Sequence, residues 1–331
     1  MSNVITIGLT GDVMLGRTLD SVIAKRGYNY PWGNMLSLMQ QTDINIINLE
    51  TTLTHSQQKV AKTFNFKSTP AKVESLLNAN VTVANLANNH ILDYSAAGLT
   101  ETIRILDKAN IKHVGAGENY DDATRSVVIE KNNIRIGVMG ATDNEPGWKA
   151  DSGPGTNYVD LTIEDEREKI LDEIKRLRGQ TDIVIVSIHW GPNMQEQPYP
   201  HFIQFAHDMI DHGAHVVHGH SAHILQGIEC YHGNLVLYDT GDFVDDYAVD
   251  PDLRNDLSAY FILHVDNLGV HKLRCVPARI FQYQVNRARN DDYQWVINRL
   301  KNLTADFGTE MDDGVVSIHH KLQQTNQTNR V

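Results

Sequence analysis

Short apolar segments with strand propensity alternate along the chain with amphipathic segments of helical periodicity, and this alternation constrains the fold more than any other feature. Strands are expected at 4–9, 43–49, 81–86, 111–114, 126–130, 134–139, 183–188 and 214–217, and helices at 15–25, 70–79, 96–109, 162–178, 200–212 and 291–306. A run of β-hairpins is expected from 224 to about 282. Such alternation is typical of an α/β fold, here closed by a β-rich C-terminal half.

The chain has no internal repeat and no low-complexity linker, so a single domain is the simplest interpretation. Its 331 residues can bury a sizeable core, and hydrophobic residues at 41% with charged residues at 21% are typical of globular proteins. We expect one domain over 1–310 and a C-terminal extension over 311–331. The end of that extension, 323–331, is polar and is expected to be disordered.

The charge balance excludes several function classes. Twenty-nine Lys plus Arg against 41 Asp plus Glu give a net charge of −12, without a local basic patch, so neither nucleic acid nor anionic lipid is an expected partner. The two cysteines are too few for a disulfide scaffold and have no metal-binding spacing. The 16 histidines stand out, because histidine is the commonest transition-metal ligand and they gather in the second half.

The N-terminal segment runs directly into the first apolar strand. It has no basic region, no long apolar region and no cleavage site of a signal peptide. No stretch approaches the roughly 18 uncharged apolar residues that a membrane-spanning helix needs. We therefore expect a cytoplasmic protein without a membrane span.

The side chains best suited to ligand binding or catalysis follow the expected strands. Ligands of open α/β sheets bind beyond the carboxyl ends of the strands, so residues there are natural site candidates. Five segments qualify, at 11–14, 48–50, 87–90, 188–191 and 218–223. They carry two acids, an amide next to a histidine, a further histidine and a histidine pair: Asp12, Glu50, Asn89, His90, His189, His220 and His223.

Each segment also has an ordinary structural interpretation. Asp12 alone is as consistent with a turn residue or a helix cap as with a ligand, and Asn88-Asn89 alone is more often a turn. His189 ends a long apolar run, where a hydrogen-bonded core histidine is as expected as a ligand. Glu50 is harder to dismiss, because a buried carboxylate must be paired or bound to a cation. The ordered set at successive strand ends favours a shared site.

The residue types favour a transition metal. Two imidazoles three residues apart beside a glycine, at His220 and His223, can converge on one ion. Mixed carboxylate, amide and imidazole ligands suit one or two ions of Mn, Fe, Co or Zn, whereas an all-oxygen Mg or Ca site would not use histidine. Such ions lower the pKa of bound water and clamp phosphate oxygens, which makes hydrolysis the expected reaction class.

The motifs resemble those of the calcineurin-like metallophosphoesterases, and among these the capsule-synthesis proteins associated with poly-γ-glutamate, the CapA or PgsA family. The matching segments are Gly-Asp-Val-Met-Leu-Gly-Arg at 11–17, Asn-Leu-Glu-Thr-Thr-Leu-Thr at 48–54, Ala-Asn-Leu-Ala-Asn-Asn-His-Ile-Leu-Asp-Tyr at 84–94, His-Trp-Gly at 189–191, Gly-His-Ser-Ala-His-Ile-Leu-Gln at 219–226 and Tyr-Asp-Thr-Gly-Asp-Phe-Val at 238–244. The resemblance covers about residues 4–280. It implies an α/β/β/α sandwich with metal between the loop ends of two sheets.

The resemblance also implies roles for single residues. Asp12, Glu50, Asn89, His189, His220 and His223 match the metal ligands, and His90 matches the adjacent general acid or an outer-shell histidine. Arg17 is a candidate contact for an anionic substrate, although an exposed helix arginine is the commoner role. One position departs from the phosphoesterases, which have a histidine where this chain has Met14. One metal site is therefore short of a ligand, and Asp242 either supplies a carboxylate there or caps a turn.

Two functions follow from the resemblance. The first is a metal-dependent hydrolase that acts on a phosphoester or a γ-glutamyl-type amide, with a small acidic or phosphorylated substrate. The second is a non-catalytic accessory protein of poly-γ-glutamate capsule synthesis that binds the acidic polymer.

Overall fold

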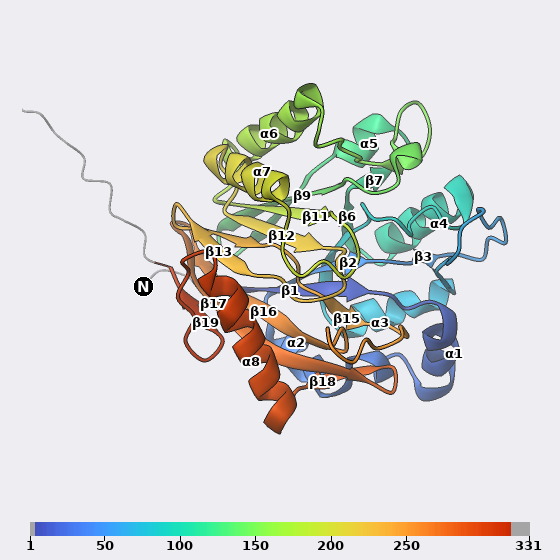
Figure 1. Ribbon diagram of the computed structural model, residues 1–331. Helices are drawn as coiled ribbons and strands as arrows, with labels where there is room; N and C mark the ends of the chain where they lie inside the picture. Colours follow the sequence, from blue (N-terminus) through green and yellow to red (C-terminus); the bar gives the residue numbers. More distant parts are fainter. Residues whose placement is uncertain (1–3, 319–331) are drawn as a thin grey trace, which may run out of the picture.

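In a computed structural model of the protein, which describes residues 4–318, two β-sheets are stacked face to face between layers of helices (Figure 1). The larger sheet has nine strands and the smaller has six. Two further strand pairs, β3 (Thr52–Leu53) with β4 (Lys67–Ser68) and β7 (Ala116–Gly117) with β10 (Gly155–Thr156), lie outside these sheets.

The nine-stranded sheet is built around the N-terminal strand. Its order is β18 (Gln284–Arg287), β17 (Gly269–Phe281), β16 (Leu257–Asp266), β1 (Ile5–Val13), β2 (Ile44–Leu49), β5 (Val81–Asn85) and β6 (Lys112–Val114). Strand β15 (Asp242–Val244) also pairs with β1, and β19 (Val315–Ser317) pairs with β17. Strands β1, β2, β5 and β6 are parallel, so their carboxyl ends meet at one edge.

The six-stranded sheet has its own parallel centre. Its order is β13 (Ile228–Tyr231), β14 (Asn234–Leu237), β12 (Val216–His220), β11 (Ile183–His189), β9 (Ile134–Thr142) and β8 (Val127–Lys131). Strands β14, β12, β11 and β9 run parallel, and β8 and β13 are antiparallel edge strands.

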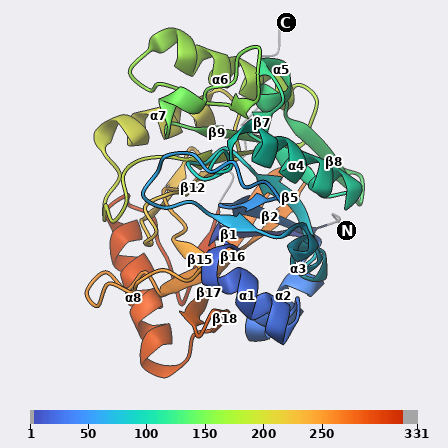
Figure 2. The same cartoon turned by 90° about the vertical axis from the view of Figure 1, so that its right-hand side faces the viewer.

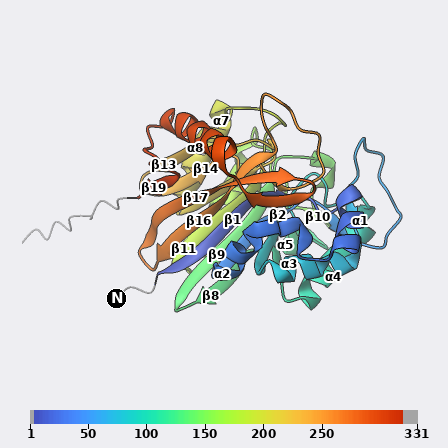
Figure 3. The same cartoon turned by 90° about the horizontal axis from the view of Figure 1, so that it is seen from below.

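Helices cover the outer faces of both sheets (Figures 1 and 2). The large sheet packs against α1 (Arg17–Arg26), α2 (Leu36–Gln41), α3 (Val73–Asn78) and α4 (Ser95–Lys108), and the small sheet against α6 (Glu164–Arg178) and α7 (Pro200–Asp211). Helix α5 (Tyr120–Thr124) contacts β7, and α8 (Asn290–Ala305) contacts β13, β16 and β17 (Figure 3). Short 3₁₀ turns occupy η1 (Tyr30–Met35), η2 (Pro70–Lys72) and η3 (Pro146–Trp148).

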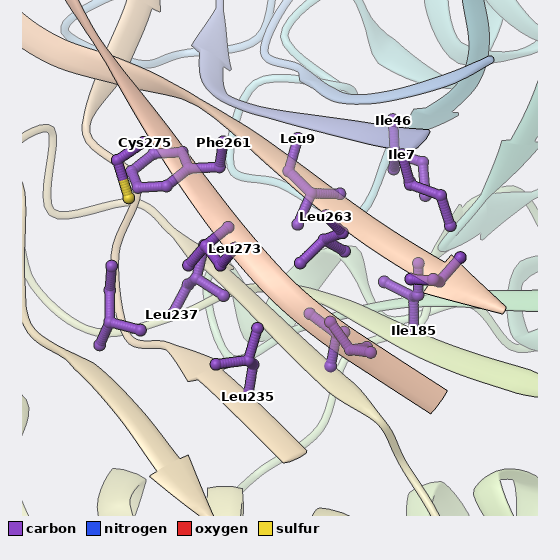
Figure 4. Close-up of a cluster of buried hydrophobic side chains, with 14 of the residues drawn as sticks. Ile7, Leu9, Ile46, Ile185, Leu235, Leu237, Phe261, Leu263, Leu273 and Cys275 are labelled. Atoms are coloured by element: carbon purple, nitrogen blue, oxygen red, sulfur yellow. The ribbon is translucent and has the colours of Figure 1, made fainter. Parts of the chain in front are cut away.

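The central core lies between the two sheets, where apolar side chains from both meet (Figure 4). Successive side chains of a strand point to opposite faces of the sheet, so alternate residues join the central core and the others pack against the helices. On β11, Ile183 and Ile185 join the central core, whereas Val184 and Val186 pack under α6 and α7. Both faces of this strand are buried, which explains its unbroken apolar sequence.

The predicted elements agree with the structure except at a few places. Strand β1 continues four residues beyond the predicted end at 9, and β12 continues three beyond the predicted end at 217, so Asp12 and His220 lie within strands rather than after them. No element was predicted at 30–41, where η1 and α2 form, nor at α5 and the short strands β3, β4, β7 and β10. The predicted run of hairpins is wrong in part, because β14 pairs in parallel with β12 and β15 in parallel with β1. The predicted extension over 311–331 contains β19, which adds to the large sheet, and its predicted disordered end lies outside the described residues. Within 4–318, no helix has the length and apolar character to cross a bilayer.

Replacing Leu263 by alanine is expected to lower the free energy of unfolding by about 2–5 kcal/mol, since the leucine is fully buried between the sheets and its loss leaves a cavity. Urea denaturation followed by circular dichroism measures this change. Leu268→Ala is the matched control, because Leu268 is 74% exposed and its replacement leaves the unfolding midpoint near that of the wild type.

Candidate metal centre

The carboxyl ends of the parallel strands from both sheets bring the predicted site residues together. Asp12 lies near the end of β1 in register with Asn48 of β2, and Glu50 follows β2 directly. In the other sheet, His189 and His220 end neighbouring strands and are register partners. The centre therefore has carboxylates on one sheet facing imidazoles on the other.

Tight backbone contacts hold these segments. A Cβ atom on Gly11 would lie 1.8 Å from the Gly241 carbonyl oxygen, so only glycine lets β1 approach the segment that leads into β15. The pairing of β1 with β2 is irregular between Leu9 and Asp12, as is common beside functional sites. His223 has a positive φ of 62°, a conformation that non-glycine residues keep only where the surroundings impose it.

Five of the six predicted metal ligands lie close enough to hold an ion. Ligand atoms of Asp12, His189 and His220 lie within 4.8 Å of one another, and so do those of Asp12, Glu50 and His223. Asp12 belongs to both groups, and Glu50 Oε1 also lies 4.0 Å from His189 Nε2. All five side chains are buried. The sixth predicted ligand, Asn89, is not a member of these groups of acids and histidines.

Unpartnered polar atoms gather in this centre. Within the described chain, five buried site atoms have no hydrogen-bond partner: Asp12 Oδ2, Glu50 Oε1, Asn89 Oδ1, His189 Nε2 and Asp242 Oδ2. Buried polar atoms are almost always satisfied, because an unpaired one costs about 1–3 kcal/mol. All five are donor atoms for a metal ion, so the residues present fit the predicted metal.

The imidazoles of the small sheet favour the neutral form. Burial lowers the pKa of His189 to about 3, and burial together with the neighbouring histidines lowers the pKa of His220 well below its usual range. Their Nδ1 atoms lie 2.9 Å apart, and Ser187 Oγ lies 3.0 Å from His220 Nε2. Neutral imidazole is the form that binds metals, so these side chains need not lose a proton on binding.

On the carboxylate side, the pKa values of Glu50 and His223 are raised rather than lowered. Burial raises the pKa of Glu50 well above its usual range, and Asp12 raises it further. Burial alone would lower the pKa of His223, but Asp242 and Glu50 raise it well above normal. Asp242, in register with Asp12, lies 2.8 Å from His223 Nδ1. Asp242 thus lies at the centre beside Asp12 and His223, and its role as a ligand stays a prediction.

His90 lies at the rim of the centre with a fixed ring orientation. Its Nδ1 is 2.6 Å from Asp93 Oδ2, and its Nε2 is 3.9 Å from Glu50 Oε1. Phe66 stacks on the imidazole, with ring centroids 3.7 Å apart. Because Asp93 holds one nitrogen, the other is directed toward the carboxylate side.

Two cationic side chains flank the same rim. Arg17 pairs with Asp246 at 3.3 Å, and its guanidinium lies over the rings of Phe64 and Phe66. Lys62 donates to the Asn89 carbonyl and pairs with Asp93 and Glu145. Both cations lower the pKa of His90, after the larger effect of its burial.

Three site residues had no assigned role in the sequence. Asn48 donates to Asp12 Oδ1 at 2.7 Å and lies 3.3 Å from His189 Nδ1. Asp93 orients His90, and the Tyr247 hydroxyl donates to Glu50 Oε2 at 2.8 Å. Asn48 and Asp93 lie within the motif segments at 48–54 and 84–94, so their spacing from Glu50 and His90 could have indicated that they belong to the site. No sequence signal pointed to Tyr247.

Replacing Asn48 by leucine is expected to weaken metal binding by about 10–100-fold, because Asn48 orients one ligand from each sheet. Isothermal titration calorimetry with Mn²⁺ or Zn²⁺ measures the affinity. Asn45→Leu is the matched control, a buried asparagine on the same strand that bonds to the Met39 and Ala79 carbonyls instead. Equal metal affinity in the two variants would contradict the role of Asn48.

Comparison with known proteins decides the family. Residues 6–247 match the family described as bacterial capsule synthesis protein PGA_cap. The chain belongs to this family. A probable polyglutamine synthesis accessory protein of Mycobacterium tuberculosis (strain H37Rv) is 31% identical, with 92% of this chain and 93% of that protein covered. The capsule biosynthesis protein CapA of Bacillus anthracis is 30% identical, with 83% of this chain and 67% of that protein covered.

The PGA_cap assignment confirms the predicted capsule-synthesis resemblance, and the two stacked sheets between helices confirm the predicted α/β/β/α sandwich. Among solved structures, a hypothetical protein of Thermus thermophilus is similar with a TM-score of 0.51 and 13% identity. The match covers 82% of this chain and 98% of that one, and at this identity it shows the fold alone.

Proposed function

We propose that this PGA_cap protein is a metal-dependent hydrolase. The observation that carries the proposal is the set of unpartnered, buried donor atoms on Asp12, Glu50, Asn89, His189 and Asp242. A protein that needed these buried positions only for stability would be expected to fill them with apolar side chains, since unpaired buried polar groups are costly. The donors would hold one or two divalent ions of Mn, Fe, Co or Zn.

Bound metal would supply a water of lowered pKa as nucleophile and a positive charge for the attacked group. The residues of the chain supply the rest. His90 Nε2 faces the centre without being needed to hold the ion, and Asp93 fixes its orientation. Because burial lowers the pKa of His90 and Asp93 holds Nδ1, Nε2 is unprotonated at rest, so His90 would accept a proton from the attacking water and then pass it to the leaving group. Arg17 at the rim would attract a small acidic or phosphorylated substrate.

The chemistry of the centre is compatible with a phosphoester or with a γ-glutamyl-type amide. A second candidate is an accessory protein that binds an acidic polymer such as poly-γ-glutamate without turnover. The name of the M. tuberculosis relative, a probable polyglutamine synthesis accessory protein, favours this candidate. The net charge of −12 favours the hydrolase, because a long polyanion would be repelled.

Turnover by metal-replete protein distinguishes the two candidates. The purified chain is loaded separately with Mn²⁺, Zn²⁺, Co²⁺ and Fe²⁺ and assayed on an aryl phosphate, a phosphodiester and a γ-glutamyl anilide. The hydrolase predicts turnover of at least one class that chelation abolishes. Binding of poly-γ-glutamate without hydrolysis of any substrate would replace the hydrolase by the accessory function.

A further inference from the structure

Strand β18 and the segment that leads from it into α8 line a pocket of about 430 Å³ in the lower part of Figure 1. Three arginines and one aspartate face it, so this pocket is cationic on a chain whose net charge is −12. Within residues 4–318, its lining has no hydrogen bond or ion pair with a proposed metal ligand. The side chains that matter are Asn34, Arg279, Phe281, Arg287, Arg289 and Asp292.

One of the three arginines is already neutralised. Arg279 Nη1 donates to Asp292 Oδ2 at 2.7 Å, and Arg279 Nε lies 3.5 Å from Asp256 Oδ2. Arg254 pairs with the same two carboxylates, so two arginines balance two aspartates in one network. The negative charge of Asp292 is therefore compensated without the other two arginines of the pocket.

Those two arginines, Arg287 and Arg289, are exposed. Neither side chain has a hydrogen bond or an ion pair in the part of the chain that the structure describes. Strand β18 ends at Arg287, and Arg289 keeps an extended backbone with φ −136° and ψ 158°. Alternate residues of an extended chain point to the same side, with Cα atoms about 7 Å apart. The buried Ala288 points to the other side, so both guanidinium groups are free to bind a ligand in the pocket.

The backbone that carries the two arginines is held in place. Asn34 Oδ1 accepts the backbone N–H of Arg287 at 2.7 Å, and Asn286 Oδ1 accepts the backbone N–H of Asn34 at 3.0 Å. The backbone N–H of Ala288 donates to the Pro277 carbonyl at 2.8 Å. A ligand therefore has to order only the two arginine side chains, which keeps the entropic cost of binding low.

Phe281 gives the pocket an apolar wall. Its side chain is 58% exposed, and the Arg279 guanidinium lies 5.2 Å from the centre of its ring. A ligand that uses both the ring and the arginines needs carbon atoms between its charged groups. The pocket thus favours an organic anion over a compact inorganic one.

We propose that this pocket binds a small organic dicarboxylate, with one carboxylate on Arg287 and the other on Arg289. The planar guanidinium group matches a carboxylate with two parallel N–H donors, which makes arginine the preferred partner for this group. The site goes beyond the proposed function, because its binding needs neither a metal ion nor hydrolysis.

Calorimetric titration of the full chain with adipate tests the site. The two carboxylates of adipate are joined by a tetramethylene chain, which matches the spacing of the two arginines. We expect one adipate per chain, and binding of acetate and of inorganic phosphate at the same ionic strength at least about tenfold weaker. The double variant Arg287→Gln, Arg289→Gln should bind adipate at least about tenfold more weakly than the wild type. Both positions are exposed, so this variant should unfold at the same temperature as the wild type.

The matched control is the double variant Arg26→Gln, Arg104→Gln, which removes the same charge from exposed positions on α1 and α4. It should bind adipate like the wild type, and so should the wild-type chain after treatment with a chelator. Absence of adipate binding, equal or tighter binding of acetate or phosphate, or unchanged affinity in Arg287→Gln, Arg289→Gln would overturn the inference. Loss of adipate binding on chelation would place the ligand on the metal centre and overturn it as well.

Discussion

The Asp12→Asn variant is expected to lose tight metal binding altogether, the largest effect on metal content of any single substitution considered. Asp12 belongs to both groups of close donors, so its loss weakens every arrangement of ions that the centre can hold. The fall in affinity should exceed the roughly 10–100-fold that removal of an outer-shell partner costs. Elemental analysis after dialysis and calorimetric titration with Zn²⁺ measure it.

Thermal unfolding gives an independent measurement of the same loss. Metal that binds only the folded chain stabilises it, by about 2.7 kcal/mol at a free concentration 100 times the dissociation constant. The melting temperature of the wild type should therefore rise with Zn²⁺ and fall with a chelator, and that of Asp12→Asn should change little. Asp43→Asn, at the opposite end of β2, is the control and should behave like the wild type. Stoichiometric metal of unchanged affinity in Asp12→Asn would show that the centre is elsewhere.

His90→Ala is expected to slow hydrolysis by about 10²–10⁴-fold while the metal content stays near that of the wild type. The reason is positional, since His90 Nε2 is directed toward the centre and the two groups of close donors form without it. Steady-state rates and elemental analysis on the same preparations test both statements.

The control is His113→Ala, a histidine that also lies beside an aspartate, Asp107 at 3.3 Å, but on β6. This variant should keep the wild-type rate. An unchanged rate in His90→Ala would remove its catalytic role, whereas loss of metal in that variant would make His90 a residue that holds the ion.

Much of this centre could be predicted because it follows a rule of α/β sheets. Asp12, Glu50, His189 and His220 are fixed by short distances in sequence from apolar strands, and parallel pairing then brings them to one edge. The pattern of buried strands also located β11, whose seven residues are all buried. Local sequence was sufficient to predict those site residues whose position depends only on where one strand ends.

Other parts could not be predicted, since their positions depend on tertiary contacts. Tyr247 lies 197 residues after Glu50 in the sequence and contacts it only in the folded chain. The ion pair between Arg17 and Asp246 holds this loop, and no sequence motif connects the two residues. The turn and helix at 30–41 have a weak helical pattern and form because Trp32 and Met35 are buried against neighbouring segments.

The position of β1 between β2 and β16 determines when this protein can complete its fold during synthesis. The parallel neighbour β2 is made within the first 49 residues, whereas the antiparallel neighbour, β16, begins at Leu257. The family match ends at residue 247, so the segments that supply the metal donors leave the ribosome before the strand that covers the open edge of β1. Until then, the nascent chain exposes an unpaired apolar strand that invites pairing with other chains. A gene fragment cut at the family boundary should therefore aggregate on expression, although it encodes every proposed metal ligand.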